Sequence, residues 1–311
     1  MSPGAEVLVL RALGLGDLLT SVPALRGLRG AFPRERLVLA CPRALHGLVR
    51  LWRLADEPLD VRPLGPIPRS FRSVEVAVNL HGAGPQSTNR LLERSPRRLI
   101  AFAHDDVPAT SGMPAWDPGE HEVERWCRLL VESGIPADPR SLSLAPPTTG
   151  PRDSKPIVVH PGAASESRRW PADRWGAVGR ALRRLGHEVL LTGSPQERGL
   201  AVDVGRRAGV PPDAVVAGRT SLVELAGIVG SARLVVSGDT GVAHLATALD
   251  VPSVVLFGPT PPSLWGPPAR SRRHRVLWTG RTGDPHGSLP DPGLLEIGVA
   301  DVLDAATELA A

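Results

Sequence analysis

Apolar residues along this chain occur in short runs bounded by glycine and proline. The run Leu234–Val236 ends at Ser237-Gly238, and a second run covers Val251–Phe257. Such a run alone fits a buried strand or a buried helix, but the flanking glycine and proline favour parallel strands of an α/β sheet. Asp239-Thr240-Gly241 between them supplies N-cap residues for a helix over 241–248. The stretch therefore predicts a strand, a turn, a helix and a second strand.

Predicted strands and helices alternate in this way in both halves of the chain, which predicts an α/β fold with parallel sheets. In the first half we expect strands at 6–11, 37–40, 74–80 and 99–102. A glycine-rich turn at 12–17 leads into a helix that ends at about residue 29, and further helices are expected at 44–53 and 120–133. In the second half we expect further strands at 157–160, 188–192 and 214–216, and further helices at 171–185, 197–208, 221–229 and 299–310.

A chain of 311 residues is long for one hydrophobic core, so two domains are expected. The proline-rich segment Ser141–Pro156 lacks a periodic apolar pattern and is the candidate linker. We predict an N-terminal domain over 1–145 and a C-terminal domain over 156–298. The remaining residues, 299–311, form a closing helix that we expect to pack back on the N-terminal domain.

Composition narrows the function classes. An apolar fraction of 42% with 22% charged residues is typical of a globular protein, and no run reaches the roughly 18 apolar residues of a membrane span. No signal peptide is recognisable, so we expect a cytoplasmic protein, whose arginine-rich surface allows peripheral contact with the inner face of a membrane. The arginines are scattered without interleaved aromatic residues, which argues against nucleic-acid binding. Cys41 and Cys127 have no metal-ligand spacing and are expected to be small buried hydrophobes.

Candidate chemistry lies in the turns after the strands, where ligands of α/β sheets bind. A helix that begins at Thr240-Gly241 presents backbone N–H groups to a diphosphate. Capping by Asp239 or Thr240 explains the same pattern equally well. His244 is open to both interpretations too, as a ligand contact or as a structural residue.

Two earlier turns of the second half carry further candidates. Ser165 offers a hydroxyl, and Arg168 offers a cation that could neutralise the charge on a leaving diphosphate. Arg168 could equally be a solvated surface charge. Glu197 follows a strand. Its carboxylate could bind ribose hydroxyls, or it could only interact favourably with the dipole at the start of a helix.

The turn after the first strand contains Gly14, Gly16 and Asp17. The third glycine of a dinucleotide fingerprint is missing, which argues against a nicotinamide cofactor. His81 lies in the corresponding glycine-rich turn after the strand at 74–80, and turns of this kind at strand ends point to a cleft. Asp17 could also be a helix cap.

Four segments of the chain together resemble glycosyltransferase family 9, the ADP-heptose:lipopolysaccharide heptosyltransferases. The most specific feature is Asp-Thr-Gly-x-x-His followed by Phe-Gly-Pro-Thr. The resemblance covers nearly the full length and is carried by Val9–Pro33, Val158–Trp175, Glu188–Glu197 and Val235–Pro267.

The resemblance implies a GT-B architecture, which has two Rossmann-like domains and a deep inter-domain cleft between an acceptor half and a nucleotide-sugar half. It implies an inverting reaction without a bound metal or other cofactor. By residue-to-residue match, Asp17 is the general base, Arg168 stands where the family usually has a lysine on the diphosphate, and Glu197 is the ribose-binding acid. The sugar and phosphates would be held by Asp239, Thr240, Gly241 and His244. Gly14, Gly16 and His81, in the N-terminal half, would lie on the acceptor side.

We therefore predict a monomeric, metal-independent glycosyltransferase that moves a sugar, expected to be heptose from ADP-heptose, onto an acceptor hydroxyl. The acceptor is a saccharide, a lipid-linked molecule or a small metabolite, since the residues do not distinguish them. The alternatives are a nucleotide-sugar epimerase or hydrolase of GT-B type and a non-catalytic nucleotide-sugar-binding protein.

Overall fold

The computed structural model describes residues 5–68, 71, 74–148, 154–269 and 271–310. The chain divides into two compact units, Met1–Leu142 and Ser143–Ala311. The division falls inside the proline-rich segment 141–156, part of which, 149–153, lies outside the described residues.

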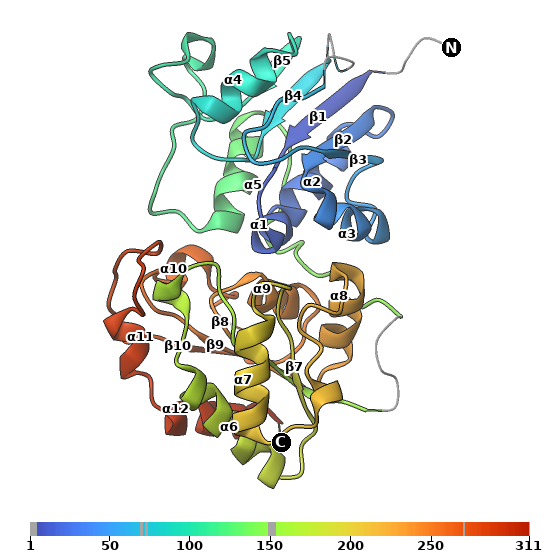
Figure 1. The fold of residues 1–311 in the computed structure, drawn as a ribbon. Coiled ribbons are helices and arrows are strands. Elements are labelled where there is room, and N and C mark those ends of the chain that lie inside the picture. Colours follow the sequence, from blue (N-terminus) through green and yellow to red (C-terminus); the bar gives the residue numbers. More distant parts are fainter. Residues whose placement is uncertain (1–4, 69–70, 72–73, 149–153, 270, 311) are drawn as a thin grey trace. The chain divides into compact units, whose positions relative to one another are not determined.

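A parallel sheet of five strands in the order β3-β2-β1-β4-β5 is the centre of the first unit (Figure 1). The edge strand β3 was not predicted, because it contains Pro58 and is only partly buried, so it lacks an apolar run. The strands are β1 Glu6–Leu10, β2 Arg36–Cys41, β3 Glu57–Asp60, β4 Val76–Asn79 and β5 Arg98–Ile100.

The single helix expected between the glycine-rich turn and about residue 29 is in fact two helices. The first ends at Thr20, with Ser21 as its C-cap, and Pro23 lies in the first turn of the second, where a missing backbone N–H costs no hydrogen bond. Helix α2 packs beside α5 in Figure 1. The helices are α1 Leu15–Thr20, α2 Val22–Ala31, α3 His46–Leu51, α4 Gln86–Leu92 and α5 Glu122–Glu132.

The second unit also has a five-stranded parallel sheet, in the order β10-β9-β8-β6-β7. The strand expected at 214–216 is wrong: Pro212–Ala214 form a 3₁₀ turn, and Val215 makes one isolated parallel bridge to Leu191 of β7. The edge strand β10 was not predicted. The strands are β6 Ile157–His160, β7 Val189–Leu191, β8 Leu234–Gly238, β9 Ser253–Leu256 and β10 His274–Leu277.

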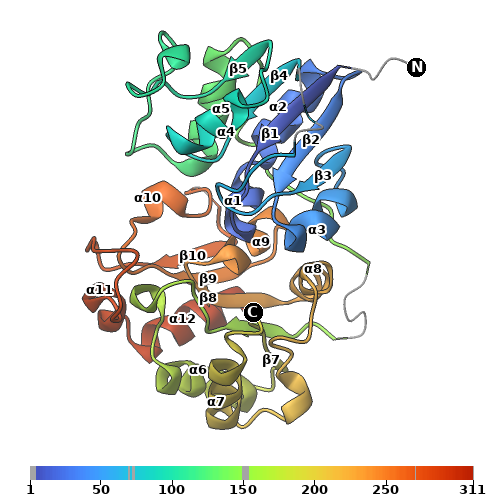
Figure 2. The ribbon, with the colours of Figure 1, turned by 45° about the horizontal axis from the view of Figure 1, so that its top comes forward.

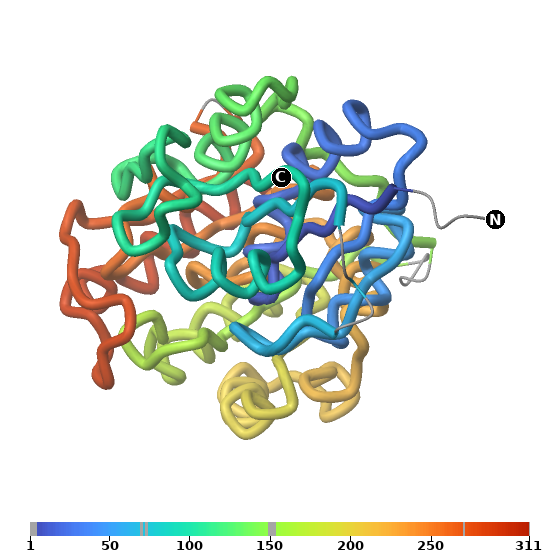
Figure 3. The backbone as a smooth tube through the Cα atoms, turned by 90° about the horizontal axis from the view of Figure 1, so that it is seen from above, coloured from blue at the N-terminus to red at the C-terminus, as the bar shows by residue number. Residues whose placement is uncertain are grey.

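In the second unit, α6 and α7 pack side by side and α12 packs against α6 (Figure 2). The chain between β10 and α11 is an irregular loop, the orange-red segment of Figure 3. The helices are α6 Ala172–Arg184, α7 Arg198–Ala208, α8 Leu222–Ser231, α9 Gly241–Ala248, α10 Pro262–Trp265, α11 Pro292–Glu296 and α12 Val299–Ala310.

The closing helix α12 belongs to the second unit. Its Val302 and Ala306 are buried in one core with Val236 of β8 and Val254 of β9. The expectation that this helix packs on the N-terminal domain therefore needs correction, since its apolar face covers the second sheet.

The cysteines behave as predicted. Cys41 and Cys127 are buried, and burial raises the pKa of each thiol to about 12, so neither is an effective nucleophile. Within the described ranges, every helix is too short or too polar to cross a membrane.

Candidate active site

The strand order places candidate residues at the switch point of each sheet. In the first unit the chain leaves β1 and β4, which are neighbours, in opposite directions, and β6 and β8 have the same relation in the second unit. Ligands of such sheets bind beyond the carboxyl ends of these strands. The turn with Asp17 follows β1 and His81 follows β4, while His160 ends β6 and Asp239 follows β8.

Asp17 is the third residue of α1 and closes its first turn. Its Oδ2 accepts a hydrogen bond of 3.1 Å from the N–H of Gly14, the N-cap residue, and Gly16 lies in the same turn. Asp17 is thus part of the helix cap, as one interpretation expected. Its side chain is nevertheless 27% exposed, so the carboxylate remains accessible to solvent.

Arg11 is a residue of this site that the sequence alone did not single out. It is only 1% exposed and lies directly after β1. Its Nε donates to the backbone oxygen of Asp17 at 2.9 Å, and its Nη2 lies 3.4 Å from Asp17 Oδ1. A charged residue at the end of an otherwise apolar strand is the signal that could have identified it.

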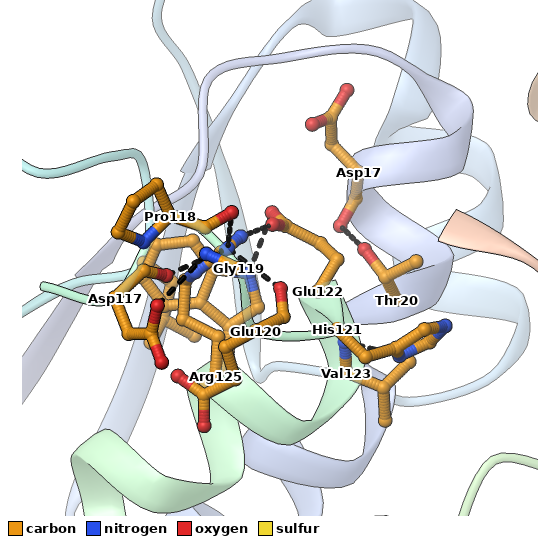
Figure 4. Close-up of polar contacts among 12 residues, drawn as sticks. Asp17, Thr20, Asp117, Pro118, Gly119, Glu120, His121, Glu122, Val123 and Arg125 are labelled. Carbon is orange, nitrogen blue, oxygen red and sulfur yellow. Dashed lines mark hydrogen bonds and ion pairs between the residues drawn. The ribbon is translucent and has the colours of Figure 1, made fainter. Parts of the chain in front are cut away.

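Glu122 at the start of α5 is the buried counterion of Arg11. Its Oε1 accepts from Arg11 Nη2 at 2.8 Å and from Trp126 Nε1 at 2.9 Å, and its Oε2 pairs with Arg125. Burial by itself would raise the pKa of Glu122. The positive charges of Arg11 and Arg125, with the hydrogen bonds from Arg11 and Trp126, outweigh burial, so this pKa lies below its usual value. Figure 4 shows Glu122 and Arg125 on α5, with Asp17 and Thr20 on α1.

His81 is fixed as a neutral imidazole. Its ring Nδ1 accepts from the backbone N–H of Ala12 at 3.2 Å, and the backbone N–H of His81 donates to Asn79 Oδ1 at 3.0 Å. Burial lowers the pKa of His81, Arg11 lowers it further, and Asp17 only partly opposes them. The structure thus places His81 beside the segment after β1 that carries Gly14, Gly16 and Asp17.

In the second unit, Arg168 and Asp239 form an ion pair. Arg168 Nη1 lies 3.7 Å from Asp239 Oδ2, and Asp239 is 5% exposed. Burial raises the pKa of Asp239 above its usual value, while His244 and Arg168 partly offset that effect. Arg168 is therefore no simple solvated charge, because it faces a buried carboxylate.

The Ser165 hydroxyl positions Arg168. Its Oγ donates to the backbone oxygen of Pro285 at 2.6 Å and accepts from Arg168 Nε at 3.3 Å. The hydroxyl proton is therefore already bonded within the protein. The loop around Pro285, in a tail to which the sequence assigned no role, packs against this turn, since the N–H of Ser167 donates to the backbone oxygen of Gly287 at 3.1 Å.

Thr240 caps α9, which begins at Gly241. Its Oγ1 accepts from the N–H of Val242 at 3.3 Å, so the capping interpretation holds for Thr240. The His244 ring packs edge-on against Trp265 with the ring centroids 5.8 Å apart. Trp265 is a further residue that the local pattern did not identify.

Glu197 lies beside the ends of β6 and β7. Its Oε2 accepts from the N–H of Ser194 at 2.7 Å and lies 3.9 Å from His160 Nε2, while His160 Nδ1 contacts Thr192 Oγ1 at 3.0 Å. Burial lowers the pKa of His160, so the ring is neutral at pH 7. Burial opposes the charge of Glu197, but the Ser194 N–H and neighbouring groups outweigh it, so the pKa of this carboxyl is lowered.

The predicted donor residues thus lie in two neighbouring groups. Ser165, Arg168, Asp239 and His244 are linked by the contacts above, and Thr240 and Gly241 begin the helix that carries His244. Glu197 belongs to the second group. In the part of the chain that the structure describes, no three His, Cys, Asp or Glu side chains are arranged to hold a metal ion.

Comparison with known proteins identifies the family. The family model described as Glycosyltransferase family 9 (heptosyltransferase) matches residues 113–285, more than half of the chain. Lipopolysaccharide heptosyltransferase 1 of Salmonella typhimurium is 37% identical over 301 residues, which cover 84% of this chain and 90% of that protein.

A second relative matches over a shorter segment. Lipopolysaccharide heptosyltransferase 1 of Pseudomonas aeruginosa is 35% identical over 169 residues, 51% of this chain, and this match spans only 45% of the relative's length.

The fold is shared with a solved structure, the ADP-heptose lipopolysaccharide heptosyltransferase II of Escherichia coli. The TM-score is 0.80 at 20% sequence identity, and the match covers 98% of each chain. The predicted GT-B fold with two Rossmann-like domains is confirmed. The chain therefore belongs to glycosyltransferase family 9, as its four sequence segments predicted.

Proposed function

We propose that this protein is an inverting glycosyltransferase that moves a heptose from ADP-heptose to an acceptor hydroxyl. Family membership supports the reaction class, and the relatives named above support the donor. The observation that carries the proposal is Asp17, an accessible carboxylate held by the Gly14 N–H and by Arg11 just beyond the end of β1.

In the proposed reaction, Asp17 takes the proton of the acceptor hydroxyl as the hydroxyl oxygen attacks the anomeric carbon. The attack comes from the face opposite the diphosphate, so a new C–O bond forms while the bond to the diphosphate oxygen breaks. ADP leaves with the bonding electron pair. A single displacement of this kind inverts the anomeric configuration.

We assign the leaving diphosphate to Arg168 and the first turn of α9. A guanidinium can neutralise the charge that develops on the leaving oxygen, so the proposed step needs no metal ion. The Arg168 Nε is already bonded to Ser165, which leaves the Nη groups to face the diphosphate and Asp239. The usual lysine of the family would be a point charge, whereas Arg168 is a planar fork.

The remaining donor contacts follow from the carboxylates and His244. We assign Asp239 and His244 to the sugar hydroxyls and Glu197 to the ribose hydroxyls, because carboxylate and imidazole groups accept hydrogen bonds from hydroxyls. The names of the relatives favour an acceptor of the lipopolysaccharide type. A cytoplasmic monomer, in contact with the inner face of the membrane when the acceptor is lipid-linked, completes the proposal.

The test is transfer from ADP-heptose to a lipopolysaccharide-type saccharide acceptor with EDTA present. Asp17→Asn should lower kcat by about 10²- to 10⁴-fold, since a positioned general base contributes that much. NMR of the wild-type product should show the inverted anomeric centre. The exposed Asp105→Asn serves as the matched control and should transfer normally.

Three results would contradict the proposal. A transfer rate of Asp17→Asn within twofold of wild type would contradict the assignment of Asp17 as the general base. Free heptose or an epimer without added acceptor would indicate a hydrolase or an epimerase. Loss of transfer in EDTA that is restored by added metal would contradict the metal-independent mechanism.

A further inference from the structure

Arg11 connects the turn that carries Asp17 to the interior of the first unit. We propose that Arg11, anchored by Glu122, is a positioning residue that fixes the Asp17 carboxylate for proton transfer. This inference rests on the proposed role of Asp17 as the general base.

The contacts of Arg11 reach two separate pieces of chain, helix α1 and the turn after β4. Its Nε donates to the backbone oxygen of Asp17 at 2.9 Å, its Nη1 donates to the backbone oxygen of Leu80, and its Nη2 donates to Thr20 Oγ1 at 3.3 Å. The guanidinium is a rigid planar fork, so these bonds fix α1 and the turn after β4 relative to the end of β1. The same Nη2 lies 3.4 Å from Asp17 Oδ1. Arg11 therefore holds both the backbone and the carboxylate of Asp17.

Glu122 and Trp126 hold Arg11 in turn. Glu122 Oε1 accepts from Arg11 Nη2 at 2.8 Å, and the Arg11 guanidinium carbon lies 4.8 Å from the Trp126 ring centroid. Trp126 Nε1 donates to the same carboxylate oxygen at 2.9 Å. Each polar partner of Arg11 is thus itself fixed by a helix or a strand end.

Stability alone does not account for this pair. Two charges that are removed from water recover little more than their desolvation cost, and an apolar pair of equal volume is often at least as stable. The Arg11–Glu122 pair has a second consequence that an apolar pair lacks, because one guanidinium nitrogen contacts both Glu122 and the accessible Asp17 carboxylate. The geometry points to orientation of Asp17 as the role of the pair.

The decisive variant is the double substitution Arg11→Met with Glu122→Gln, which removes both charges of the pair. Arg125 loses its carboxylate partner in this variant but keeps its hydrogen bonds to the backbone oxygens of Asp117 and Glu120. We expect a folded protein whose kcat for heptose transfer falls about 10- to 100-fold, since a misplacement of about 1 Å can cost 10²-fold. The KM for ADP-heptose should stay within threefold, because the donor contacts are elsewhere. The single variant Arg11→Lys should have a kcat between those of the double variant and the wild type, because lysine keeps the positive charge but lacks the planar guanidinium.

Two control variants separate positioning from general loss of structure. Leu48→Ala removes a buried side chain of α3 and should lower the melting temperature without lowering kcat of the folded protein. Arg97→Met removes an exposed arginine paired with Glu75 and should change neither quantity.

Amide hydrogen exchange tests the inference without any activity assay. The Gly14 N–H is bonded to the Asp17 carboxylate, so exchange at Gly14 and across α1 should become at least tenfold faster in the double variant, and not in Leu48→Ala. Unchanged exchange would overturn the inference, as would a folded double variant whose kcat is within twofold of wild type.

The failure of this inference can be distinguished from the failure of the proposed function. If Asp17→Asn itself transfers normally, the proposed function fails. If Asp17→Asn is inactive while the double variant is active, only the positioning role of Arg11 fails.

Discussion

At the scale of single residues, three acidic side chains have different roles because their surroundings differ. Asp17 is bonded to one backbone N–H and is partly open to solvent, Glu122 is buried between two guanidinium groups, and Asp239 is buried with one cation at 3.7 Å. Nothing in the local sequence separates these cases. Asp17 and Asp239 were identified through the family motif, whereas Glu122 is recognised only from its contacts.

The raised pKa of Asp239 makes a prediction about stability. Burial raises the pKa above the usual 3.8, so the folded protein binds this proton more tightly than the unfolded chain does. The resulting contribution to stability is present at low pH and is lost as the pH rises through 3.8 and then through the folded-state pKa. At pH 7, where the carboxyl is ionised in the unfolded chain, burial of this group therefore disfavours folding of the ligand-free protein.

Asp239→Asn should accordingly raise the free energy of unfolding of the ligand-free protein at pH 7, and the gain should shrink towards pH 3. The same variant should bind ADP-heptose at least tenfold more weakly, because a sugar contact is lost. Urea unfolding at several pH values and calorimetry with ADP-heptose measure the two effects. A variant that is less stable at pH 7, or that binds the donor normally, would contradict the assignment.

At the scale of elements, strongly apolar strands were predicted and weakly apolar ones were not. Strands β1, β6 and β8 are buried on both faces, so their apolar residues form continuous runs. Strands β3 and β10 lie at sheet edges and are partly exposed, so polar residues interrupt them. The turns between strands and helices were predicted as binding sites because glycine and cap residues mark them.

One turn allows a sharp test of the donor site. A Cβ built on Gly162 would lie 2.2 Å from Glu197 Cδ, so Gly162→Ala must displace the carboxylate that accepts from the Ser194 N–H. We expect the variant to bind ADP about tenfold more weakly, as judged by calorimetry, with the fold retained.

Gly199→Ala is the matched control. A Cβ at Gly199, which lies inside α7, meets no atom within 4 Å. The substitution should leave ADP affinity unchanged and raise stability by about 0.5–1 kcal/mol, because alanine favours the helix more than glycine does. Equal ADP affinity in Gly162→Ala and Gly199→Ala would contradict the assignment of Glu197 to the donor site.

At the scale of the whole molecule, each of the two units is built on a five-stranded parallel sheet, although the strand orders differ: β3-β2-β1-β4-β5 in the first and β10-β9-β8-β6-β7 in the second. In each sheet the chain leaves two neighbouring strands in opposite directions, β1 and β4 in the first unit and β6 and β8 in the second, so each sheet presents one set of turns at a switch point. The chemistry differs between the two sets: Asp17 and His81 lie in the first unit, and Arg168, Glu197, Asp239 and His244 lie in the second.

Ligand binding should be visible in the stability of the entire chain. ADP at 100 times its dissociation constant should stabilise the folded protein by about 2.7 kcal/mol, and EDTA should leave that shift unchanged. A thermal-shift series with ADP, GDP and UDP at equal concentrations measures it. A larger shift with GDP or UDP would contradict ADP as the nucleotide, and a shift abolished by EDTA would contradict metal independence.

The sequence by itself determined the alternation of strands and helices, the two Rossmann-like domains, the family and the turns that carry Asp17, Arg168, Glu197, Asp239 and His244. These follow from local signals, because burial of a parallel strand, helix capping and a family motif are each written in neighbouring residues. Only the tertiary structure decided which distant residues support them. Arg11 and Glu122, the first residue of α5, are 111 positions apart, and Ser165 meets Pro285 across 120 positions. Such contacts depend on the packing of whole elements, which no local pattern encodes.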